Sequence, residues 1–235
     1  SARYAYKLKK PLRQPVMDYR TRAARRKGCR EEVRLNRRLA PSVYLAVVPL
    51  SISRSGGLRL GPGARVEDWL VRMRRLPSAR MLDRILARGT LTVAELEPLL
   101  RHLTKFFRRA RRQSMDGASY VRRLRRQIAA NRRALRRFDA RLQQRLVEAA
   151  TGAQLHCAAR LRAALAVRGS RVVEGHGDLR PEHVCLGPPL CVIDCVEFDR
   201  DLRLLDPFEE LAFLALEIER LGHRNLAMEM ARRAA

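Results

Sequence analysis

Two aspartates in the last third of the chain have the type and spacing that phosphoryl-transfer chemistry needs. Asp178 lies in a His-x-Asp turn after a short apolar stretch, and Asp194 follows the next apolar stretch 16 residues later. A turn at a strand end can direct one carboxylate into a cleft, and a second carboxylate can face it across a hairpin. One general base and one metal ligand would then lie together, as phosphoryl transfer requires. Aspartates near strand ends are also common structural residues, so the spacing alone leaves both interpretations open.

The elements that must position these aspartates follow an α+β order. Period-two alternation and β-branched content predict strands at residues 3–10, 43–52, 58–60, 66–73, 172–173, 184–186 and 190–196. Helical spacing covers residues 21–39, 78–169 and 206–221. We therefore expect two unequal lobes, a small antiparallel sheet with one helix over residues 1–77 and a larger helical lobe over residues 78–235.

Composition limits the class of protein. The chain has 235 residues, of which 46% are hydrophobic, so it can bury a core and wholesale disorder is excluded. No apolar run approaches the roughly 18 residues of a membrane helix. Lys7, Lys9 and Lys10 occupy the place of the apolar region of a signal peptide. The five cysteines have no paired C-x-x-C spacing, so we expect reduced thiols in a cytoplasmic protein and no zinc site.

Five separated blocks carry a resemblance to a known family. The stretch His176–Leu179 followed by Ile193-Asp194 resembles the catalytic and metal-binding loops of the aminoglycoside phosphotransferase and choline-kinase-like family. The other similar blocks are Tyr4–Pro11, Glu31–Leu39, Met73–Pro77, and Cys195–Glu197 with Asp206–Phe213. Together they are similar to the kinase-like domain of bacterial bifunctional aminoglycoside phosphotransferase/ATP-binding proteins. The resemblance implies a protein-kinase-like fold whose small lobe is truncated before Lys7, and we expect the chain to be a fragment of a longer gene product.

The same resemblance implies roles for single residues at the reacting end of the site. Asp178 would be the base that accepts the proton of the acceptor hydroxyl, and Asp194 would bind Mg²⁺. His183 stands where the family has an asparagine metal ligand, and an imidazole is a poorer magnesium ligand than an oxygen. Asp206 would brace the catalytic loop through its backbone N–H groups, and His176 would be structural.

Further roles concern the nucleotide. Lys7 would hold the ATP phosphates; Lys9 points to the same face of the strand, so the choice of Lys7 depends on the resemblance. Glu32, or its neighbour Glu31, would pair with that lysine, with a surface ion pair as the alternative. Met73 would meet the adenine at the hinge between the lobes. ATP and Mg²⁺ are the implied cofactors, and a P-loop ATPase domain is an expected partner in the full-length product, because this chain has no Gly-Lys-Ser/Thr motif.

These residues predict ATP-dependent phosphoryl transfer to a hydroxyl group of a small-molecule acceptor. An aminoglycoside acceptor is not favoured, because an Arg-rich surface repels a polycation. The alternative from another class is a catalytically impaired kinase-like module that binds nucleotide, nucleic acid or a protein partner. His183 and the few residues before Lys7 favour that alternative, whereas Asp178, Asp194 and Glu32 favour the enzyme.

The chain is strongly basic, with 50 Lys and Arg against 24 Asp and Glu and a net charge of +26. Residues 105–148 contain 15 of these cations. An apolar seam at helical spacing runs through them, formed by Val121, Leu124, Ile128, Leu135, Phe138 and Leu142. This pattern predicts a helix packed by one side, and an anion-binding surface is the second interpretation. Charge without base-reading motifs predicts weak, non-specific binding of polyanions.

Overall fold

The computed structural model describes residues 3–14, 16–89, 91–138 and 144–234, and it contains two compact units. The first unit is formed by Ser1–Ala110 and Gly175–Ala235, and the second by Arg111–Glu174. Helices and antiparallel strands occur together, which confirms the expected α+β class. The lobe boundary expected after Pro77 stays a prediction.

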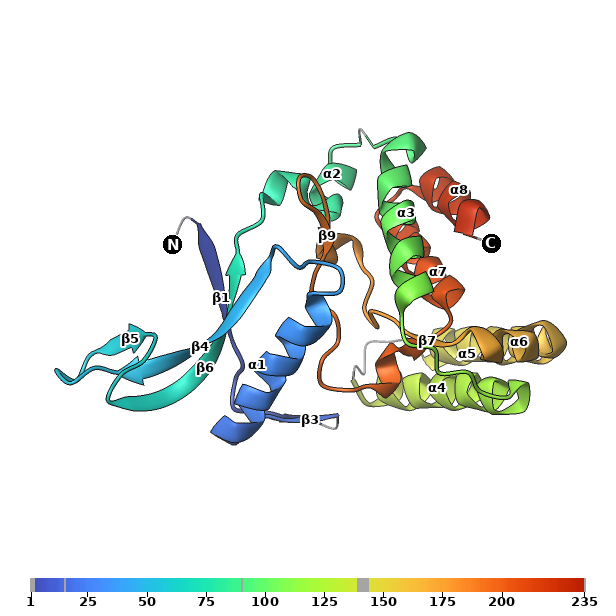
Figure 1. Ribbon diagram of the computed structural model, residues 1–235. Coiled ribbons are helices and arrows are strands. Elements are labelled where there is room, and N and C mark those ends of the chain that lie inside the picture. Colours follow the sequence, from blue (N-terminus) through green and yellow to red (C-terminus); the bar gives the residue numbers. More distant parts are fainter. Residues whose placement is uncertain (1–2, 15, 90, 139–143, 235) are drawn as a thin grey trace. The chain divides into compact units, whose positions relative to one another are not determined.

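A four-stranded antiparallel sheet carries the first lysines of the chain (Figure 1). Its strands are β1 (Tyr4–Leu8), β4 (Tyr44–Ile52), β5 (Leu58–Leu60) and β6 (Arg65–Arg74), in the order β1-β6-β4-β5. In the register of β6, Val71 lies between Lys7 of β1 and Val47 of β4. The pairing of β1 with β6 thereby fixes the register of Lys7 in the sheet.

Helix α1 (Arg22–Asn36) contacts β4 and β6 of this sheet (Figure 1). The helix begins at the Thr21 cap, whose hydroxyl accepts a hydrogen bond from the Ala24 N–H at 3.2 Å, because a serine or threonine there satisfies one orphan donor. Its buried face carries Cys29 and Val33, which lie in one hydrophobic cluster with Tyr44, Val71, Cys185 and Cys191. The last two residues face each other across the hairpin of β8 (Val184–Leu186) and β9 (Leu190–Val192). One core therefore supports both α1 and the hairpin that leads to Asp194.

The first unit is completed by short strands and by four helices. They are β2 (Arg13–Gln14), β3 (Met17–Asp18), β10 (Leu204–Leu205), α2 (Leu82–Leu86), α3 (Val93–Arg109), α7 (Pro207–Arg220) and α8 (Arg224–Ala234). A capping box of Thr92 and Glu95 starts α3, which satisfies two otherwise unpaired donors. Helix α8 contacts both α3 and α7.

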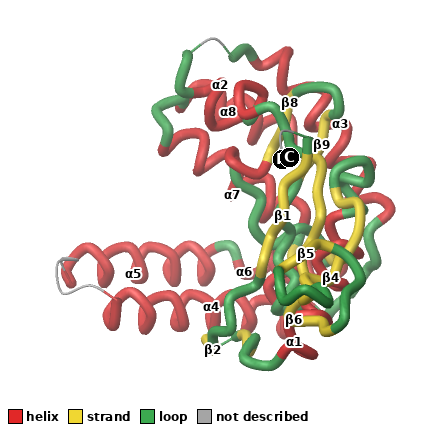
Figure 2. The backbone as a smooth tube through the Cα atoms, turned by 90° about the vertical axis from the view of Figure 1, so that its left-hand side faces the viewer, coloured by secondary structure: helices red, strands yellow, loops and turns green. Residues whose placement is uncertain are grey.

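The second unit contains α4 (Gly117–Phe138), α5 (Gln144–Arg160), α6 (Arg162–Arg168) and the short β7 (Val173–Glu174). Helices α4 and α5 lie side by side (Figure 2). Val121 is buried, as the seam predicts, but Leu135 is exposed, so only part of the seam is covered. Leu142 and the side chain of Phe138 lie outside the described residues. None of the helices described is long and apolar enough to cross a membrane.

Candidate active site

Glu32 is the centre of a charged cluster between α1 and β1. Its carboxylate is fully buried and receives two lysines: Lys7 Nζ lies 3.0 Å from Oε1, and Lys9 Nζ lies 2.7 Å from Oε2. Lys7 also binds Asp194 Oδ1. Burial alone would lower the pKa of Lys7, but the charges of Glu32 and Asp194 outweigh it and raise that pKa. Lys7 is therefore a permanent cation that joins α1 to the loop of Asp194.

Lys9 forms a second ionic connection, from Glu32 to Glu197, and it is more deeply buried than Lys7. This lysine is 6% exposed and also binds Glu197 Oε1, which accepts a further hydrogen bond from the Tyr19 hydroxyl at 3.0 Å. Its pKa is raised for the same reason as that of Lys7, because Glu32 and Glu197 outweigh burial. A buried cation is tolerated only when it is paired in this way. Lys9 and Glu197 are thus structural supports of the site.

The backbone at Asp194 has the conformation that turns its side chain out of the strand. We expected a strand through residue 196, but β9 ends at Val192, because Asp194 has φ +64°, the one left-handed non-glycine residue in the described ranges. Two partners hold this turn: the Asp194 N–H donates to the Tyr44 hydroxyl at 3.1 Å, and the Cys195 N–H donates to Asn36 Oδ1 at 2.9 Å. The extended backbone of the strand ends here, and the half-exposed carboxylate of Asp194 is directed toward Lys7.

Glu210 of α7 holds the turn that carries Asp178. Its two oxygens each accept the His176 N–H at 3.0 Å, and Oε1 also accepts the Gly177 N–H. Gly177 has φ +88°, a left-handed conformation that favours glycine. Burial raises the pKa of Glu210 to about 7, although the two N–H donors favour the ionised form. Asp206, for which the bracing role was implied, caps α7 by accepting the Phe208 N–H at 2.9 Å.

His176 connects the two loops, as a structural residue would. Its Nε2 lies 2.9 Å from the Ile193 carbonyl oxygen, and its Nδ1 accepts the Asp178 N–H at 3.3 Å. Burial lowers the pKa of His176 to about 3, so the ring is neutral at physiological pH. A neutral ring with Nε2 as donor and Nδ1 as acceptor fits both bonds.

His183 lies between the two aspartates. Its Nδ1 lies 2.8 Å from the Asp178 carbonyl oxygen and 3.7 Å from Asp178 Oδ2, while its Nε2 lies 3.8 Å from Asp194 Oδ2. When Nδ1 donates to that carbonyl, Nε2 of a neutral ring presents a lone pair to the carboxylate. A positive charge between these two atoms, either a proton or a metal ion, would remove the resulting repulsion.

The environments of the two aspartates move their pKa values in opposite directions. Burial raises the pKa of Asp178, although His183 and Arg180 partly offset it. Burial also acts on Asp194, but the charge and hydrogen bond of Lys7 outweigh it and lower that pKa. Two carboxylates whose pKa values diverge are suited to different tasks, one as a proton acceptor and one as a permanent anion.

A cavity of about 530 Å³ opens beside these aspartates. Its polar lining includes Lys7, Asp178, Asp194 and Glu197. Apolar side chains complete the wall, among them Leu8, Leu12, Met17, Phe198 and Leu202. A small molecule in this cavity would contact both carboxylates and an uncharged surface.

The structure brings most of the expected site residues together. Lys7 contacts both Glu32 and Asp194, and His183 lies beside Asp178. Of the two glutamates considered on α1, Glu32 faces Lys7, whereas Glu31 pairs with Arg34 on the surface. Met73, expected to meet the adenine, lies in β6 and packs against the hydrophobic cluster of α1 and the sheet. It is not among the residues that line the cavity at Asp178, and its contact with adenine stays a prediction.

The sequence reasoning missed the supporting roles of three residues, Lys9, Glu197 and Glu210, although each had a signal. Lys9 repeats the face of Lys7 two positions later, and Glu197 follows Asp194 by three. Glu210 lies on the buried face of α7, four positions before Leu214 and eight before Ile218. A glutamate on an apolar helical face indicates a buried partner, since an unpaired charge is costly there.

The donor set near Asp194 fits a divalent cation. Among the described residues, no three His, Cys, Asp or Glu side chains form a complete metal site. Magnesium is usually held by one or two carboxylates together with water and substrate phosphates, so a full protein cage is not needed. Asp194, with His183 beside it, would hold such an ion. Glu182, which precedes His183 in the chain, pairs with Arg180 at 2.9 Å.

Comparisons with known proteins give relatives without an assigned activity. No protein-family model matches the chain. Uncharacterized proteins of Mycobacterium bovis (Mb2027c) and of two Mycobacterium tuberculosis strains (MT2060 and Rv2004c) are 29% identical over 234 residues, which cover 94% of this chain and 44% of each relative. The chain thus spans less than half the length of the curated relatives it matches.

A solved structure of a glucosamine kinase (crystal form A) has a TM-score of 0.44 and 14% identity, and the match covers 99% of this chain and 57% of that one. A TM-score below 0.5 does not establish a common fold. The argument for function therefore depends on the residues of the site itself.

Proposed function

We propose that this chain is the kinase-like part of an ATP-dependent phosphotransferase that acts on a hydroxyl group of a small molecule. One observation carries the proposal: Lys7 binds both the buried Glu32 and the half-exposed Asp194, while Asp178 stands beside them with a raised pKa. Phosphoryl transfer combines three parts: a lysine that a glutamate holds in place, an aspartate that binds a metal ion, and a base. The sequence blocks that resemble aminoglycoside phosphotransferases and choline kinases support the same assignment.

In the proposed reaction, Asp178 accepts the proton of the acceptor hydroxyl. The acceptor oxygen forms a bond to the γ-phosphorus while the bond from that phosphorus to the ADP oxygen breaks, so the products are a phosphomonoester and ADP. Lys7 would bind phosphate oxygens and offset their charge. A magnesium ion held by Asp194 and His183 would supply further neutralisation of the phosphates.

The lining of the cavity supports an acceptor other than a polycation. Lys7 and Lys10 lie in the lining beside the apolar side chains of Leu8, Leu12 and Phe198. An acceptor with several ammonium groups would face these lysines without enough carboxylates to pair with them. A neutral or amphipathic alcohol fits this wall better.

The test is a search for the phosphomonoester. The protein would be incubated with ATP, Mg²⁺ and a panel of neutral sugars, amino alcohols and apolar alcohols, and new phosphomonoester signals would be sought by ³¹P NMR. A new signal with matching ADP supports the proposal. ATP consumption that yields only inorganic phosphate, or no consumption with any acceptor, would favour the non-catalytic alternative.

A further inference from the structure

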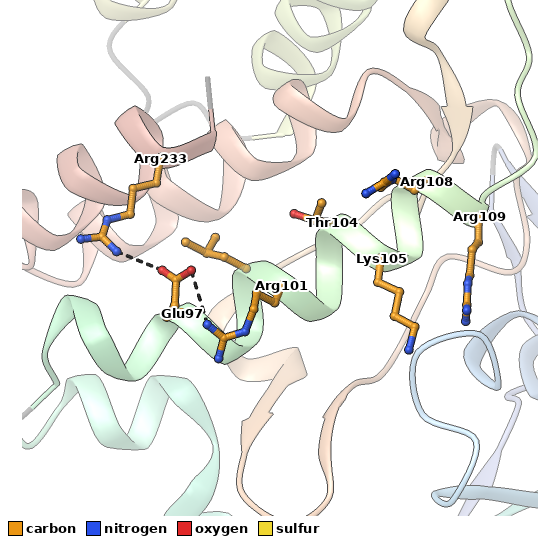
Figure 3. A pocket seen from close by; sticks show the side chains of 8 residues that line it. Glu97, Arg101, Thr104, Lys105, Arg108, Arg109 and Arg233 are labelled. Carbon is orange, nitrogen blue, oxygen red and sulfur yellow. Dashed lines mark hydrogen bonds and ion pairs between the residues drawn. The ribbon is translucent and has the colours of Figure 1, made fainter.

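A basic groove runs along the surface of α3 in the first unit (Figure 3). We define this α3 groove by its charged lining residues, Glu97, Arg101, Lys105, Arg108, Arg109 and Arg233. The first five belong to α3 and the last to α8. The hollow has a volume of about 850 Å³ and shares no residue with the cavity at Asp178.

The charges of the α3 groove are unbalanced at one end. Glu97 is bound by Arg233 at 2.9 Å and approached by Arg101 at 3.5 Å, so the groove's one carboxylate is already engaged. Lys105, Arg108 and Arg109 have no ion-pair partner in the described part of the chain. Arg233 is also paired with Glu229 at 2.9 Å. Five cations against these two carboxylates leave three uncompensated positive charges in a concave surface, those of Lys105, Arg108 and Arg109. Such a surface attracts an anion with several charges.

The cations follow the periodicity of the helix. Arg101, Lys105 and Arg109 lie along one line of α3, with Thr104 and Arg108 on the neighbouring line (Figure 3). Like charges four residues apart destabilise a helix. The helix dipole compensates for this only at the last turn, so it accounts for Arg108 and Arg109 and not for Arg101 or Lys105. An anion in the groove would remove the repulsion along the whole line.

A second hollow of about 360 Å³ adjoins the basic end, and it shares Lys105 and Arg109 with the α3 groove. Pro41 and Phe106 give this hollow an apolar surface. The Arg38 guanidinium lies 5.1 Å from the centroid of the Phe106 ring, within the range of a cation–π contact. A ligand bound at Lys105 and Arg109 thus has space for an uncharged part next to its anionic part.

We propose that the α3 groove binds a small molecule that carries two or more phosphate groups, at a site separate from the candidate active site. Phosphate fits this lining because guanidinium groups bind its oxygens in pairs and the Thr104 hydroxyl supplies a neutral donor. The line from Arg101 to Arg109 is roughly 12 Å long, at about 1.5 Å per helical residue. A ligand of that length neutralises these cations only if its own groups are densely charged. The carboxylate of Glu97 repels anions at the other end of the groove. This repulsion favours a compact ligand over an extended nucleic acid.

The test uses inorganic tripolyphosphate as the probe, titrated calorimetrically into the protein with a metal chelator present. The chelator removes metal-dependent binding at Asp194, where the carboxylates repel a free polyanion. We expect saturable one-to-one binding that the combined change Lys105→Gln, Arg108→Gln and Arg109→Gln weakens at least tenfold. Glutamine retains helix propensity and removes only charge. Lys105→Gln alone should weaken binding severalfold, which keeps the test decisive if the triple variant unfolds.

The matched control removes the same charge from the second unit. Arg122, Arg125 and Arg126 are exposed residues of α4, and their replacement by glutamine should change the affinity less than twofold. Equal losses in both triple variants would show that the net charge of the chain attracts the probe, which contradicts a built site. Binding without saturation would contradict it as well. Tighter binding of a single-stranded oligonucleotide, lost in the same α3 variants, would replace the proposal with a nucleic-acid surface.

Discussion

Lys9 binds the same buried carboxylate that positions Lys7. The Nζ of Lys9 lies 2.7 Å from Glu32 Oε2, while Lys7 occupies Oε1 at 3.0 Å. The two lysines differ in burial, since the Lys7 side chain is 38% exposed and that of Lys9 is 4% exposed. This arrangement separates a structural lysine from one that can reach a ligand.

The difference in burial predicts different losses of stability. Lys9→Met leaves Glu197 and one oxygen of Glu32 without their cation, and breaking a buried ion pair costs about 3–5 kcal/mol. Lys7→Met should cost clearly less free energy of unfolding, because its side chain is partly solvated and Lys9 still balances Glu32. Urea unfolding of both variants measures the two values. Equal losses would contradict the division of roles.

Asp178→Asn should abolish most turnover without unfolding the protein. The amide keeps the shape of the side chain but cannot accept the proton, and loss of a general base lowers the rate by about 10²–10⁴-fold. Steady-state rates with a productive acceptor, together with thermal melting of the variant, check this. A variant with wild-type turnover would show that Asp178 is not the base.

Glu210 makes stability depend on pH. Its folded pKa of about 7 lies above the usual value near 4.5. At pH values between 4.5 and 7, the folded state therefore holds a proton that the unfolded state has lost. This contribution to stability is complete below pH 4.5 and declines as the pH rises to 7, by up to about 3 kcal/mol at 1.36 kcal/mol per pKa unit. The buried, neutral His176 acts in the opposite direction, because its pKa is lowered.

Comparison of the wild type with Glu210→Gln isolates the glutamate from His176. The wild type should lose stability relative to the glutamine variant as the pH increases from 4.5 to 7.5. Chemical denaturation at several pH values measures the difference. A difference that stays constant, or that grows in favour of the wild type at higher pH, would place the pKa of Glu210 near its usual value.

His183→Asn should lower the magnesium concentration needed for activity. An amide oxygen is a harder ligand than an imidazole nitrogen, and magnesium prefers oxygen. The matched variant His183→Ala removes the ligand and should raise the requirement. Magnesium titrations of turnover compare the three proteins. The same half-saturating concentration in all of them would show that His183 does not contact the ion.

Local patterns were sufficient to predict most of the first unit. Alternation predicted β1, β-rich content predicted β4, apolar spacing predicted α1, and Asp206-Pro207 predicted the start of α7. These elements follow from short-range preferences that neighbouring residues do not override. The motif that contains Asp178 likewise indicated where the candidate site lies.

Long-range contacts were not predictable in the same way. The strand expected through residue 196 ends at Val192, because Tyr44 and Asn36 hold the loop at Asp194 from elements about 150 residues away in sequence. The support of the turn by Glu210 depends on how α7 packs, which no local spacing specifies. The choice between Lys7 and Lys9, which both bind Glu32, also required their burial and the position of Asp194 in space.

The most direct test of the central claim is the affinity for ATP in magnesium and in chelator, measured by calorimetry on the wild type and on Asp194→Ala. The carboxylate of Asp194 is directed by its left-handed backbone toward Lys7, and it is the residue that would bind the metal bridging to the phosphates. We expect magnesium to strengthen ATP binding at least tenfold in the wild type and to have no effect in the variant. Equal ATP affinity in magnesium and in chelator for the wild type would contradict a phosphotransferase site and favour a non-catalytic module.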